Sequence, residues 1–150
     1  MVQVAIRSKL FGTYISLNGT GITHYRGYQY KGTVKTVEHV RSWETFKLHC
    51  NDNGTVSFES SIFPNVFLSL DGKDIQPGVI TGPGGGSVAA EYKNQEWEKF
   101  NIHRHGGGAT VAIESEIFPR RYLRVNGRTN EVNVQGGALS YEQFEIVVVG

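Results

Sequence analysis

The densest group of chemically versatile side chains in the sequence lies between residues 20 and 31. It consists of three tyrosines, a histidine and an arginine within seven residues: His24, Tyr25, Arg26, Tyr28 and Tyr30. A tyrosine ring offers a flat apolar face and a hydroxyl group, which suit the CH-rich face and the hydroxyl edge of a pyranose. Histidine and arginine donate directional hydrogen bonds to hydroxyl groups. The cluster indicates a ligand-binding loop; the alternative is that the tyrosines fold back and stabilise their own loop.

Polar side chains at turns and near the end of the chain extend the set of candidate ligand contacts. Asn18, Asp71 and Asn126 occupy equivalent Asx-Gly turns. An Asx side chain at a turn either faces a ligand or hydrogen-bonds to its own backbone, and the sequence leaves both alternatives open. A polar strip after the last of these turns is a candidate second site and comprises Arg128, Asn130, Asn133 and Gln135.

Three glutamates recur at equivalent places and raise the question of acid–base catalysis. Glu44, Glu98 and Glu142 each lie between two aromatic residues. On a threefold scaffold such positions are too far apart to act as one catalytic pair, so we expect each carboxylate to accept hydrogen bonds from a turn or the backbone. The sequence contains no hydrolase motif and no phosphate-binding loop. We therefore predict that the protein is not an enzyme.

Histidine and cysteine are placed unfavourably for a metal site. His103 and His105 form a His-x-His pair, which a strand would place on one face. Metal binding needs a third ligand, and no cysteine or carboxylate stands nearby at suitable spacing. Cys50 aligns with the inward face of a strand, where we expect a small buried side chain rather than a nucleophile. We predict neither a metal nor another cofactor.

The elements that position these residues follow from three sequence markers that recur three times in the same order. The first is an alternating strand segment at residues 4–8, 56–60 and 111–115. The second closes on an Asx-Gly pair, with glycines at 19, 72 and 127, where we expect a positive φ. The third is an aromatic-Glu-x-Phe segment that begins at Trp43, Trp97 and Tyr141. The recurrence predicts three copies of one structural unit.

Each unit shows the period-two alternation of β-strands and no helical stripe. A third strand is predicted around Val34, Val88 and Val132, and a fourth begins at Phe46, Phe100 and Phe144. Four strands in three pseudo-symmetric units make twelve, which predicts an all-β fold, the β-trefoil, with six barrel strands and six hairpin strands. One unit cannot bury its own apolar face. We therefore predict one domain over residues 1–150, with units at about 1–53, 54–108 and 109–150.

The first two units carry insertions between their second and third strands. These insertions span residues 20–31 and 73–86, and the second is rich in proline and glycine. Loops of this length on a compact barrel are often functional. Residues found in every unit are attributed to architecture, so we interpret Trp43, Trp97 and Tyr141 as packing residues rather than sugar-stacking platforms. The aromatic cluster of the first insertion has no counterpart in the other units and carries the functional hypothesis.

The recurring segments resemble those of the fascin-like, or actin-cross-linking-like, β-trefoils. The likeness rests on Tyr122–Gly127 and on the W-E-x-F segments Trp43–Phe46 and Trp97–Phe100. Residues 58–64 and 111–119 also resemble arabinose-binding trefoil modules and the interleukin-1 signature, which Leu70 breaks. The arabinose module's Arg-His pair is missing because Val125 follows Arg124, so its ligand is not implied. The resemblance implies the fold, which hosts lectins, cytokines, inhibitors and actin bundlers.

Composition excludes several classes of function. The 150 residues carry a net charge of +1 and contain one cysteine. A neutral chain has no long-range field that selects nucleic acid or an anionic membrane surface, and one cysteine excludes a disulfide scaffold. The longest apolar run is too short for membrane insertion. Residues 1–7 do not resemble a signal peptide, so we expect a cytoplasmic protein, or one secreted without such a peptide.

Together these patterns predict a non-catalytic carbohydrate-binding protein, a β-trefoil lectin whose partners are glycans or glycoproteins. Loop aromatics and polar turn residues would hold the sugar. Two alternatives stay open at this point. The first is an actin-binding or actin-cross-linking protein, and the second is an interleukin-1-like signalling ligand.

Overall fold

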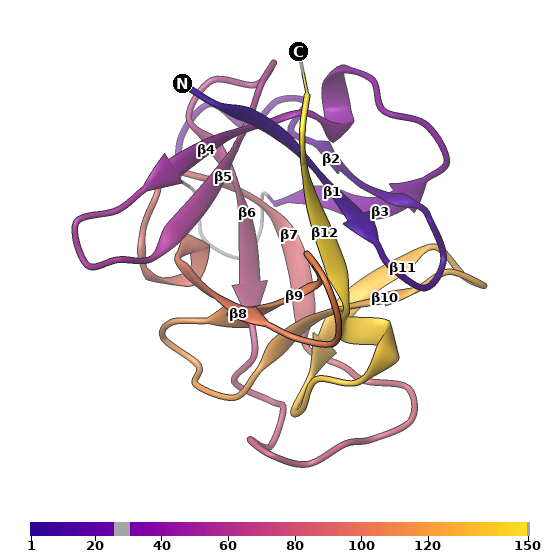
Figure 1. The fold of residues 1–150 in the computed structure, drawn as a ribbon. Helices are drawn as coiled ribbons and strands as arrows, with labels where there is room; N and C mark the ends of the chain where they lie inside the picture. Colours follow the sequence, from indigo (N-terminus) through magenta and orange to yellow (C-terminus); the bar gives the residue numbers. More distant parts are fainter. Residues whose placement is uncertain (26–30, 150) are drawn as a thin grey trace.

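The computed structural model describes residues 1–25 and 31–149. Within them the chain forms twelve β-strands in three sets of four, which we call units 1, 2 and 3 (Figure 1). Unit 1 contains β1 (Gln3–Ser8), β2 (Tyr14–Asn18), β3 (Gly32–Val37) and β4 (Phe46–Cys50). Unit 2 contains β5 (Val56–Ser60), β6 (Val66–Asp71), β7 (Ser87–Tyr92) and β8 (Phe100–Arg104). Unit 3 contains β9 (Val111–Ser115), β10 (Tyr122–Asn126), β11 (Glu131–Gln135) and β12 (Phe144–Val148).

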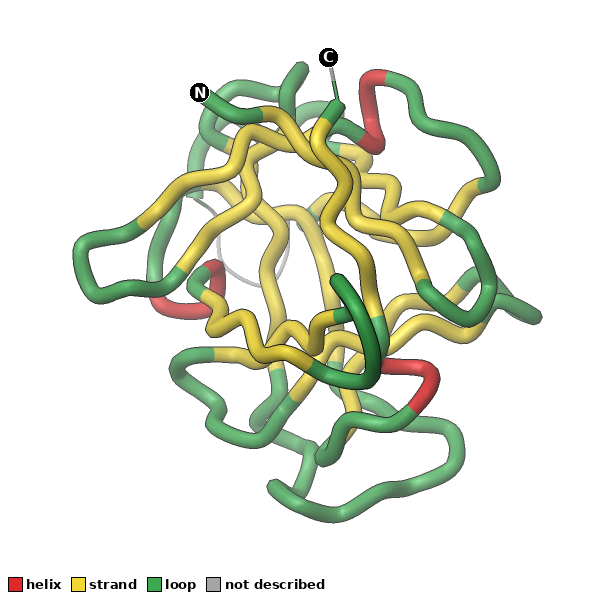
Figure 2. Tube along the Cα trace, viewed as in Figure 1, coloured by secondary structure: helices red, strands yellow, loops and turns green. Residues whose placement is uncertain are grey.

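A single turn of 3₁₀ helix precedes the fourth strand of every unit, drawn in red in Figure 2. These turns are η2 (Ser42–Glu44), η3 (Glu96–Glu98) and η4 (Ser140–Glu142). They contain the aromatic-Glu pairs that the sequence repeats. In the part of the chain that the structure describes, no helix is long and apolar enough to cross a membrane.

Six strands close a barrel and the other six form hairpins. Strand β1 pairs with β4 and β12, β4 with β5, β5 with β8, β8 with β9, and β9 with β12, which completes the ring. The hairpins are β2–β3, β6–β7 and β10–β11, and β3 pairs with both β7 and β11. This is the β-trefoil that the sequence predicts, with all twelve strands at the predicted places.

The core is built by side chains from all three units. Phe46, Phe100 and Phe144, which open the fourth strands, are fully buried. The ring centroid of Phe58 lies 6.3 Å from that of Phe46 and 6.0 Å from that of Phe100. Aliphatic residues of barrel and hairpins complete the core, among them Ile6, Ile15, Leu17, Leu68, Leu70, Ile113, Leu123 and Val125. Burying one such side chain stabilises the fold by about 2 kcal/mol, and each unit obtains this burial only from the others.

The aromatic residue of each 3₁₀ turn packs against a phenylalanine of the next unit. The ring centroids are 6.0 Å apart for Trp43 and Phe63, 5.8 Å for Trp97 and Phe118, and 5.1 Å for Tyr141 and Phe11. The third contact joins unit 3 to unit 1 and closes the cycle. These contacts are the packing role that the sequence predicts for the three aromatics.

Two of the closing glycines are required for space rather than for backbone conformation. None of Gly19, Gly72 and Gly127 has a positive φ, so that expectation is wrong. A Cβ atom on Gly19 would lie 3.0 Å from the Phe63 ring, and one on Gly127 would collide with the Phe11 ring. The chain therefore passes directly over an aromatic ring at these points, and only glycine leaves room for it.

Cys50, which the alternation predicts to be buried, is exposed. It is the last residue of β4 and pairs with Val56 at the tip of the β4–β5 hairpin. The alternation of inward and outward side chains continues to the end of the hairpin, but the core does not extend that far. The inward-facing register therefore does not bury the thiol.

Candidate functional site

Each unit carries a pocket at an equivalent place, between its third strand and its 3₁₀ turn. The unit-2 pocket has a volume of about 510 Å³, and its lining includes Tyr25, Lys31, Glu91, Gln95, Trp97 and Glu98. The unit-1 pocket has about 480 Å³, with Lys35, Val37, His39, Arg41, Trp43 and Glu44. The unit-3 pocket has only about 140 Å³, with Thr81, Gly82, Arg124, Gln135, Tyr141 and Glu142. The scaffold is shared, and the side chains and loops decide how much of each pocket is open.

A buried glutamate from the 3₁₀ turn lies beneath every pocket. In unit 2, Glu98 Oε2 accepts a hydrogen bond from Ser69 Oγ at 2.6 Å, and Oε1 accepts one from the Gln95 backbone N–H at 2.8 Å. Glu44 of unit 1 is held in the same way by Ser16 Oγ at 2.6 Å and the Arg41 N–H at 2.7 Å. These carboxylates fix their turns, which is the structural role that the sequence suggests.

The unit-3 glutamate, Glu142, accepts the same backbone hydrogen bond, but its second partner is an arginine instead of a serine. Glu142 Oε1 accepts a hydrogen bond from the Leu139 N–H at 2.7 Å. The place of Ser16 and Ser69 is taken by Arg124, whose Nε lies 3.8 Å from Glu142 Oε2. Both side chains of this ion pair are buried. Unit 3 therefore neutralises its buried carboxylate, and unit 2 offers a hydroxyl instead.

Burial makes the unit-2 carboxyl groups weaker acids than usual. Desolvation raises the pKa of Glu98, the hydrogen bonds from Ser69 and Gln95 lower it, and the nearby Glu91 raises it again. Desolvation also raises the pKa of Glu91, against the hydrogen bond from Tyr92 and the charge of Lys31. The two buried carboxyl groups of this pocket thus favour a partner that supplies hydroxyl hydrogen bonds or a positive charge.

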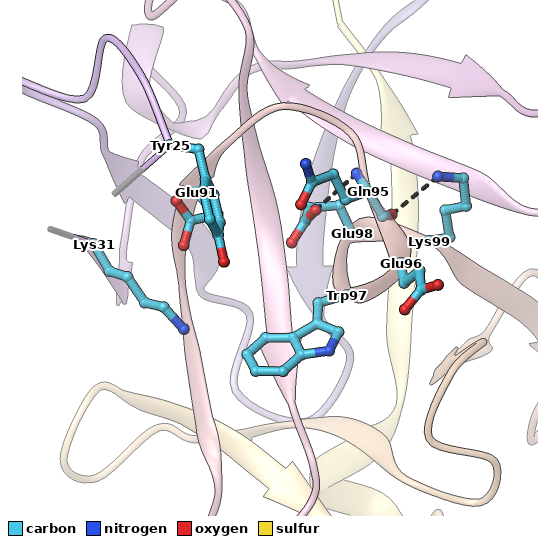
Figure 3. A pocket seen from close by; sticks show the side chains of 8 residues that line it. All are labelled: Tyr25, Lys31, Glu91, Gln95, Glu96, Trp97, Glu98 and Lys99. Atoms are coloured by element: carbon cyan, nitrogen blue, oxygen red, sulfur yellow. Dashed lines mark hydrogen bonds between the residues drawn. The ribbon is translucent and has the colours of Figure 1, made fainter. Parts of the chain in front are cut away.

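Three segments far apart in sequence build the walls of the unit-2 pocket (Figure 3). The first insertion supplies Tyr25 and Lys31, β7 supplies Glu91, and η3 with its flanking residues supplies Gln95 and Trp97. In the close-up view the Trp97 indole lies below Glu91 and Gln95, and the Lys31 side chain points toward it. The pocket therefore combines two aromatic rings with carboxylate, amide and ammonium groups.

Glu91 is a site residue that the sequence analysis missed. It is only 4% exposed, and its Oε1 accepts a hydrogen bond from the Tyr92 N–H at 3.1 Å. Glu91 pairs with Phe67 in the β6–β7 hairpin. The residues equivalent to Phe67 are Tyr14 in unit 1 and Tyr122 in unit 3, and they pair with Val37 and Gln135. Val37 and Gln135 are therefore the equivalents of Glu91. A buried charge confined to one unit is the signal that a comparison of the three units could have provided.

Trp97 already interacts with positive charges from the protein itself. The Lys31 Nζ atom lies 4.9 Å from the centroid of the indole ring, and the Lys73 Nζ atom lies 5.8 Å from it. Cations are attracted to the negative face of an indole at such distances. The two lysines come from the ends of the two insertions, so both loops contribute a cation to this ring.

The unit-1 pocket is open and more basic. Trp43 exposes 37% of its surface and stands beside Lys35, His39 and Arg41. The unit-2 and unit-3 pockets are each lined in part by the insertion of the preceding unit. Unit 3 precedes unit 1 around the barrel and has no such insertion, so among the described residues no equivalent loop covers the unit-1 pocket. Its lining combines a partly exposed indole with three nitrogen-bearing side chains and the carboxylates of Glu38 and Glu44.

The unit-3 pocket is filled by the backbone of the second insertion. Arg124 Nη2 donates to the Gly82 carbonyl oxygen at 3.0 Å, and Asn133 Nδ2 donates to the Pro83 carbonyl oxygen at 3.0 Å. The Thr81 N–H donates to Gln135 Oε1 at 3.0 Å, and Gln135 Nε2 donates to the Thr81 carbonyl oxygen. Three side chains of unit 3 thus hold a loop of unit 2 in place of a ligand.

These bonds change the interpretation of the predicted polar strip. Asn133 and Gln135 are buried and engaged with the second insertion, whereas Arg128 is exposed and lines none of the three described pockets. The structure does not bring the strip together as one surface. The loop that covers Asn133 and Gln135 lies about fifty residues earlier in the chain, so the local sequence gives no sign of it.

The three Asx side chains cap their own turns. Asn18 Oδ1 accepts hydrogen bonds from Thr20 N–H at 3.0 Å and Thr20 Oγ1 at 2.6 Å. Asp71 Oδ1 accepts from the Lys73 N–H at 3.2 Å, and Asn126 Oδ1 accepts from the Arg128 N–H at 3.0 Å. None of the three lines one of the pockets described here, so the structural alternative accounts for them.

The aromatic cluster of the first insertion is described only in part. Tyr25 is 54% exposed and lines the unit-2 pocket. His24 is exposed, and its Nδ1 lies 3.1 Å from Thr23 Oγ1. Arg26, Tyr28 and Tyr30 lie outside the described residues. The one predicted residue of this cluster that can be placed in a pocket is therefore Tyr25.

The His-x-His pair is divided between different partners. His103 Nε2 lies 2.5 Å from Glu114 Oε1, and His105 Nε2 lies 3.3 Å from the Leu139 carbonyl oxygen. Among the residues that the structure describes, no group of three or more histidine, cysteine, aspartate or glutamate side chains could hold a metal ion.

Comparison with solved structures relates the chain to β-trefoil proteins. ThreeFoil, a designed threefold-symmetric protein, is 9% identical over 98% of this chain and 99% of its own, with a TM-score of 0.72. SeviL bound to asialo-GM1 saccharide is 10% identical over 97% and 96%, with a TM-score of 0.69. A ricin B-like lectin of Macrolepiota procera in complex with lactose is 14% identical over 97% and 94%, with a TM-score of 0.68. At these identities the likeness shows the fold alone.

The sequence itself adds no closer relationship. No protein-family model matches it, and no curated protein does. The likeness to fascin and to interleukin-1 stays a prediction.

Proposed function

We propose that this protein binds carbohydrate without acting as an enzyme, with the unit-2 pocket as its principal site and the unit-1 pocket as a second one. The make-up of the unit-2 pocket carries the proposal. Rings of Tyr25 and Trp97 stand beside the carboxyl groups of Glu91 and Glu98 and the amide of Gln95. Ring surface next to a few directional polar groups is the combination that a small polyhydroxylated ligand requires.

Two proteins of the same fold support a glycan as the ligand. One solved structure holds an asialo-GM1 saccharide and another holds lactose. The pockets in units 1 and 2, at about 480 and 510 Å³, are within the size range of small-ligand sites. Free glycans or glycoproteins would therefore be the partners.

The hydrogen bonds of Glu98 favour binding over catalysis. Both of its carboxylate oxygens accept hydrogen bonds that hold η3 in place, and Glu44 repeats these bonds in unit 1. A general acid or base has to exchange a proton with its substrate. A carboxylate that is fixed in the same structural role in two units is poorly suited to that task.

A glycan array followed by calorimetric titration of the best ligand tests the proposal. We expect Tyr25→Ala and Gln95→Ala each to weaken binding about tenfold, because each removes a contact worth about 1–1.5 kcal/mol. Arg128→Ala is the matched control, since Arg128 is exposed and lines none of the described pockets. It should bind like the unchanged protein.

Two results would contradict the proposal. Failure of the unchanged protein to bind any glycan at high micromolar concentration would remove the binding function. Release of shortened saccharide during the titration would overturn the non-catalytic part.

A further inference from the structure

Two ammonium groups of the protein itself occupy the space over Trp97. Lys31 Nζ and Lys73 Nζ lie 4.9 Å and 5.8 Å from the indole centroid, on a residue that lines the unit-2 pocket. Neither lysine belongs to a strand: Lys31 ends the first insertion and Lys73 begins the second. The pocket therefore attracts cations already, and it holds them on loop segments rather than on the rigid barrel.

One carboxylate oxygen of Glu91 accepts no hydrogen bond from the residues that the structure describes. Glu91 is 4% exposed and lines the same pocket. Its Oε1 accepts the hydrogen bond from Tyr92, whereas Oε2 accepts none from the residues that the structure describes. Protein atoms do not seal it off, since in the described part of the chain the one enclosed side-chain polar atom without a partner is Thr13 Oγ1. Glu91 Oε2 is thus an acceptor open to the cavity.

We propose that the unit-2 pocket recognises an amino sugar with an unsubstituted amine, whose ammonium group takes the place of Lys31 over Trp97 and pairs with Glu91. This inference rests on the proposed carbohydrate function and specifies its ligand. An indole face and a carboxylate together stabilise an ammonium group by cation–π attraction and a charge-assisted hydrogen bond. The sugar ring would then extend toward Tyr25 and Gln95, the remaining ring and amide of the pocket.

The same geometry disfavours two related classes of sugar. Acetylation makes the amine neutral, so it loses both the attraction to the indole and the ion pair with Glu91. A sugar acid would place a further negative charge beside the carboxyl groups of Glu91 and Glu98, which share the pocket. The pocket should therefore distinguish sugars by whether the nitrogen substituent is a charged amine or a neutral amide.

Calorimetric titration with the methyl glycoside of glucosamine and with its N-acetylated form, at neutral pH, tests the inference. We expect the free amine to bind about tenfold more tightly, a difference of about 1.4 kcal/mol. Glu91→Gln keeps an oxygen for the Tyr92 N–H and should abolish the difference between the two sugars. Glu96→Gln, at an exposed carboxylate on the rim of the same pocket, is the matched control and should preserve it.

A second variant tests the displacement of Lys31. Lys31→Met keeps the apolar stem but removes the competing cation, so the amine form should bind about threefold more tightly, with no change for the acetylated form. This result does not depend on how well Glu91→Gln folds. Equal affinity of the variant and the unchanged protein for the amine would contradict the displacement.

The outcomes separate the inference from the proposed function. Equal affinity for the two sugars, lost in Tyr25→Ala, would overturn the amine preference and leave carbohydrate binding in place. No binding of any saccharide would remove both. Binding of Nα-acetyl-lysine amide as tightly as the amino sugar would show that the pocket recognises an ammonium group alone, and would overturn the assignment to a sugar.

Discussion

The unit-2 and unit-3 pockets occupy equivalent places on the barrel. In each case the insertion of the preceding unit contacts the pocket, but it leaves the unit-2 pocket open and fills most of the unit-3 pocket. The first insertion places Tyr25 and Lys31 in the wall of the unit-2 pocket and leaves about 510 Å³ open. The second insertion lays its backbone into the unit-3 pocket, where about 140 Å³ remains. The fold therefore offers three pockets, and the loops decide which of them can receive a ligand.

The residue opposite the buried glutamate explains the different outcomes. Ser69 neutralises none of the charge of Glu98, whereas Arg124 pairs with Glu142 and also binds the Gly82 carbonyl oxygen. Asn133, which corresponds to Ala89 of unit 2, adds a second bond to the loop. Arg124 and Asn133 therefore donate the hydrogen bonds that anchor the second insertion in the unit-3 pocket. Their equivalents in unit 2 are Ser69 and Ala89, which make no such bonds to the described residues of the first insertion, so the unit-2 cavity stays open.

The largest expected effect comes from removing the arginine that anchors the loop. Arg124→Ala leaves the buried Glu142 without its cation and the Gly82 carbonyl without its donor. We expect the free energy of unfolding to fall by about 3 kcal/mol or more, measured by chemical denaturation. Arg128→Ala is the control and should change it by less than about 0.5 kcal/mol. A loss as small as that of the control would mean that the loop is held by other contacts.

A smaller effect is expected where only one loop bond is removed. Asn133→Ala deletes the donor to the Pro83 carbonyl oxygen and the acceptor for Arg124 Nη1. We expect a loss of about 1–3 kcal/mol and faster amide hydrogen exchange confined to residues 80–86. Exchange spread over the barrel strands instead would show that the loop and the barrel open together.

The sequence predicts the fold well because the threefold pattern is local and repeated. Alternation within each segment locates all twelve strands, and the recurring aromatic-Glu pairs locate the three turns beneath the pockets. Glu44 and Glu98 have the structural role expected of them because their partners, Ser16 and Ser69, recur as well. Features that every unit shares can be deduced by comparing the units.

The pockets could not be predicted in the same way, because they depend on contacts between units. Asn133 and Gln135 look like an exposed polar strip until the second insertion is seen to cover them. Glu91 joins Tyr25 in one cavity although the two residues lie in different units. Cys50 follows the inward register of β4 but lies beyond the end of the core. The alternation of side chains along a strand predicts which face of the sheet a residue lies on, but not which loop or unit packs against that face.

The smallest effect concerns pH and compares the two buried glutamates directly. Burial raises the pKa of Glu98 in the folded protein, so between the unfolded and folded pKa values the folded state binds more protons than the unfolded state. Its contribution to stability is therefore complete below the unfolded pKa and is lost as pH rises through the folded pKa. Glu98→Gln carries no such charge, and its stability relative to the unchanged protein should increase as pH rises through that window.

Glu142→Gln sharpens the comparison, because Glu142 also has a raised pKa but faces the charges of Arg124 and His105. The stability of Glu142→Gln relative to the unchanged protein should therefore also increase as pH rises, because the raised pKa means that ionisation of Glu142 destabilises the folded state. The charges of Arg124 and His105 lower the pKa of Glu142, whereas the neutral Ser69 takes the place of Arg124 beside Glu98, so we expect the smaller increase for Glu142→Gln, measured by denaturation across a pH series. Parallel curves for the two variants would mean that Arg124 does not set unit 3 apart from unit 2.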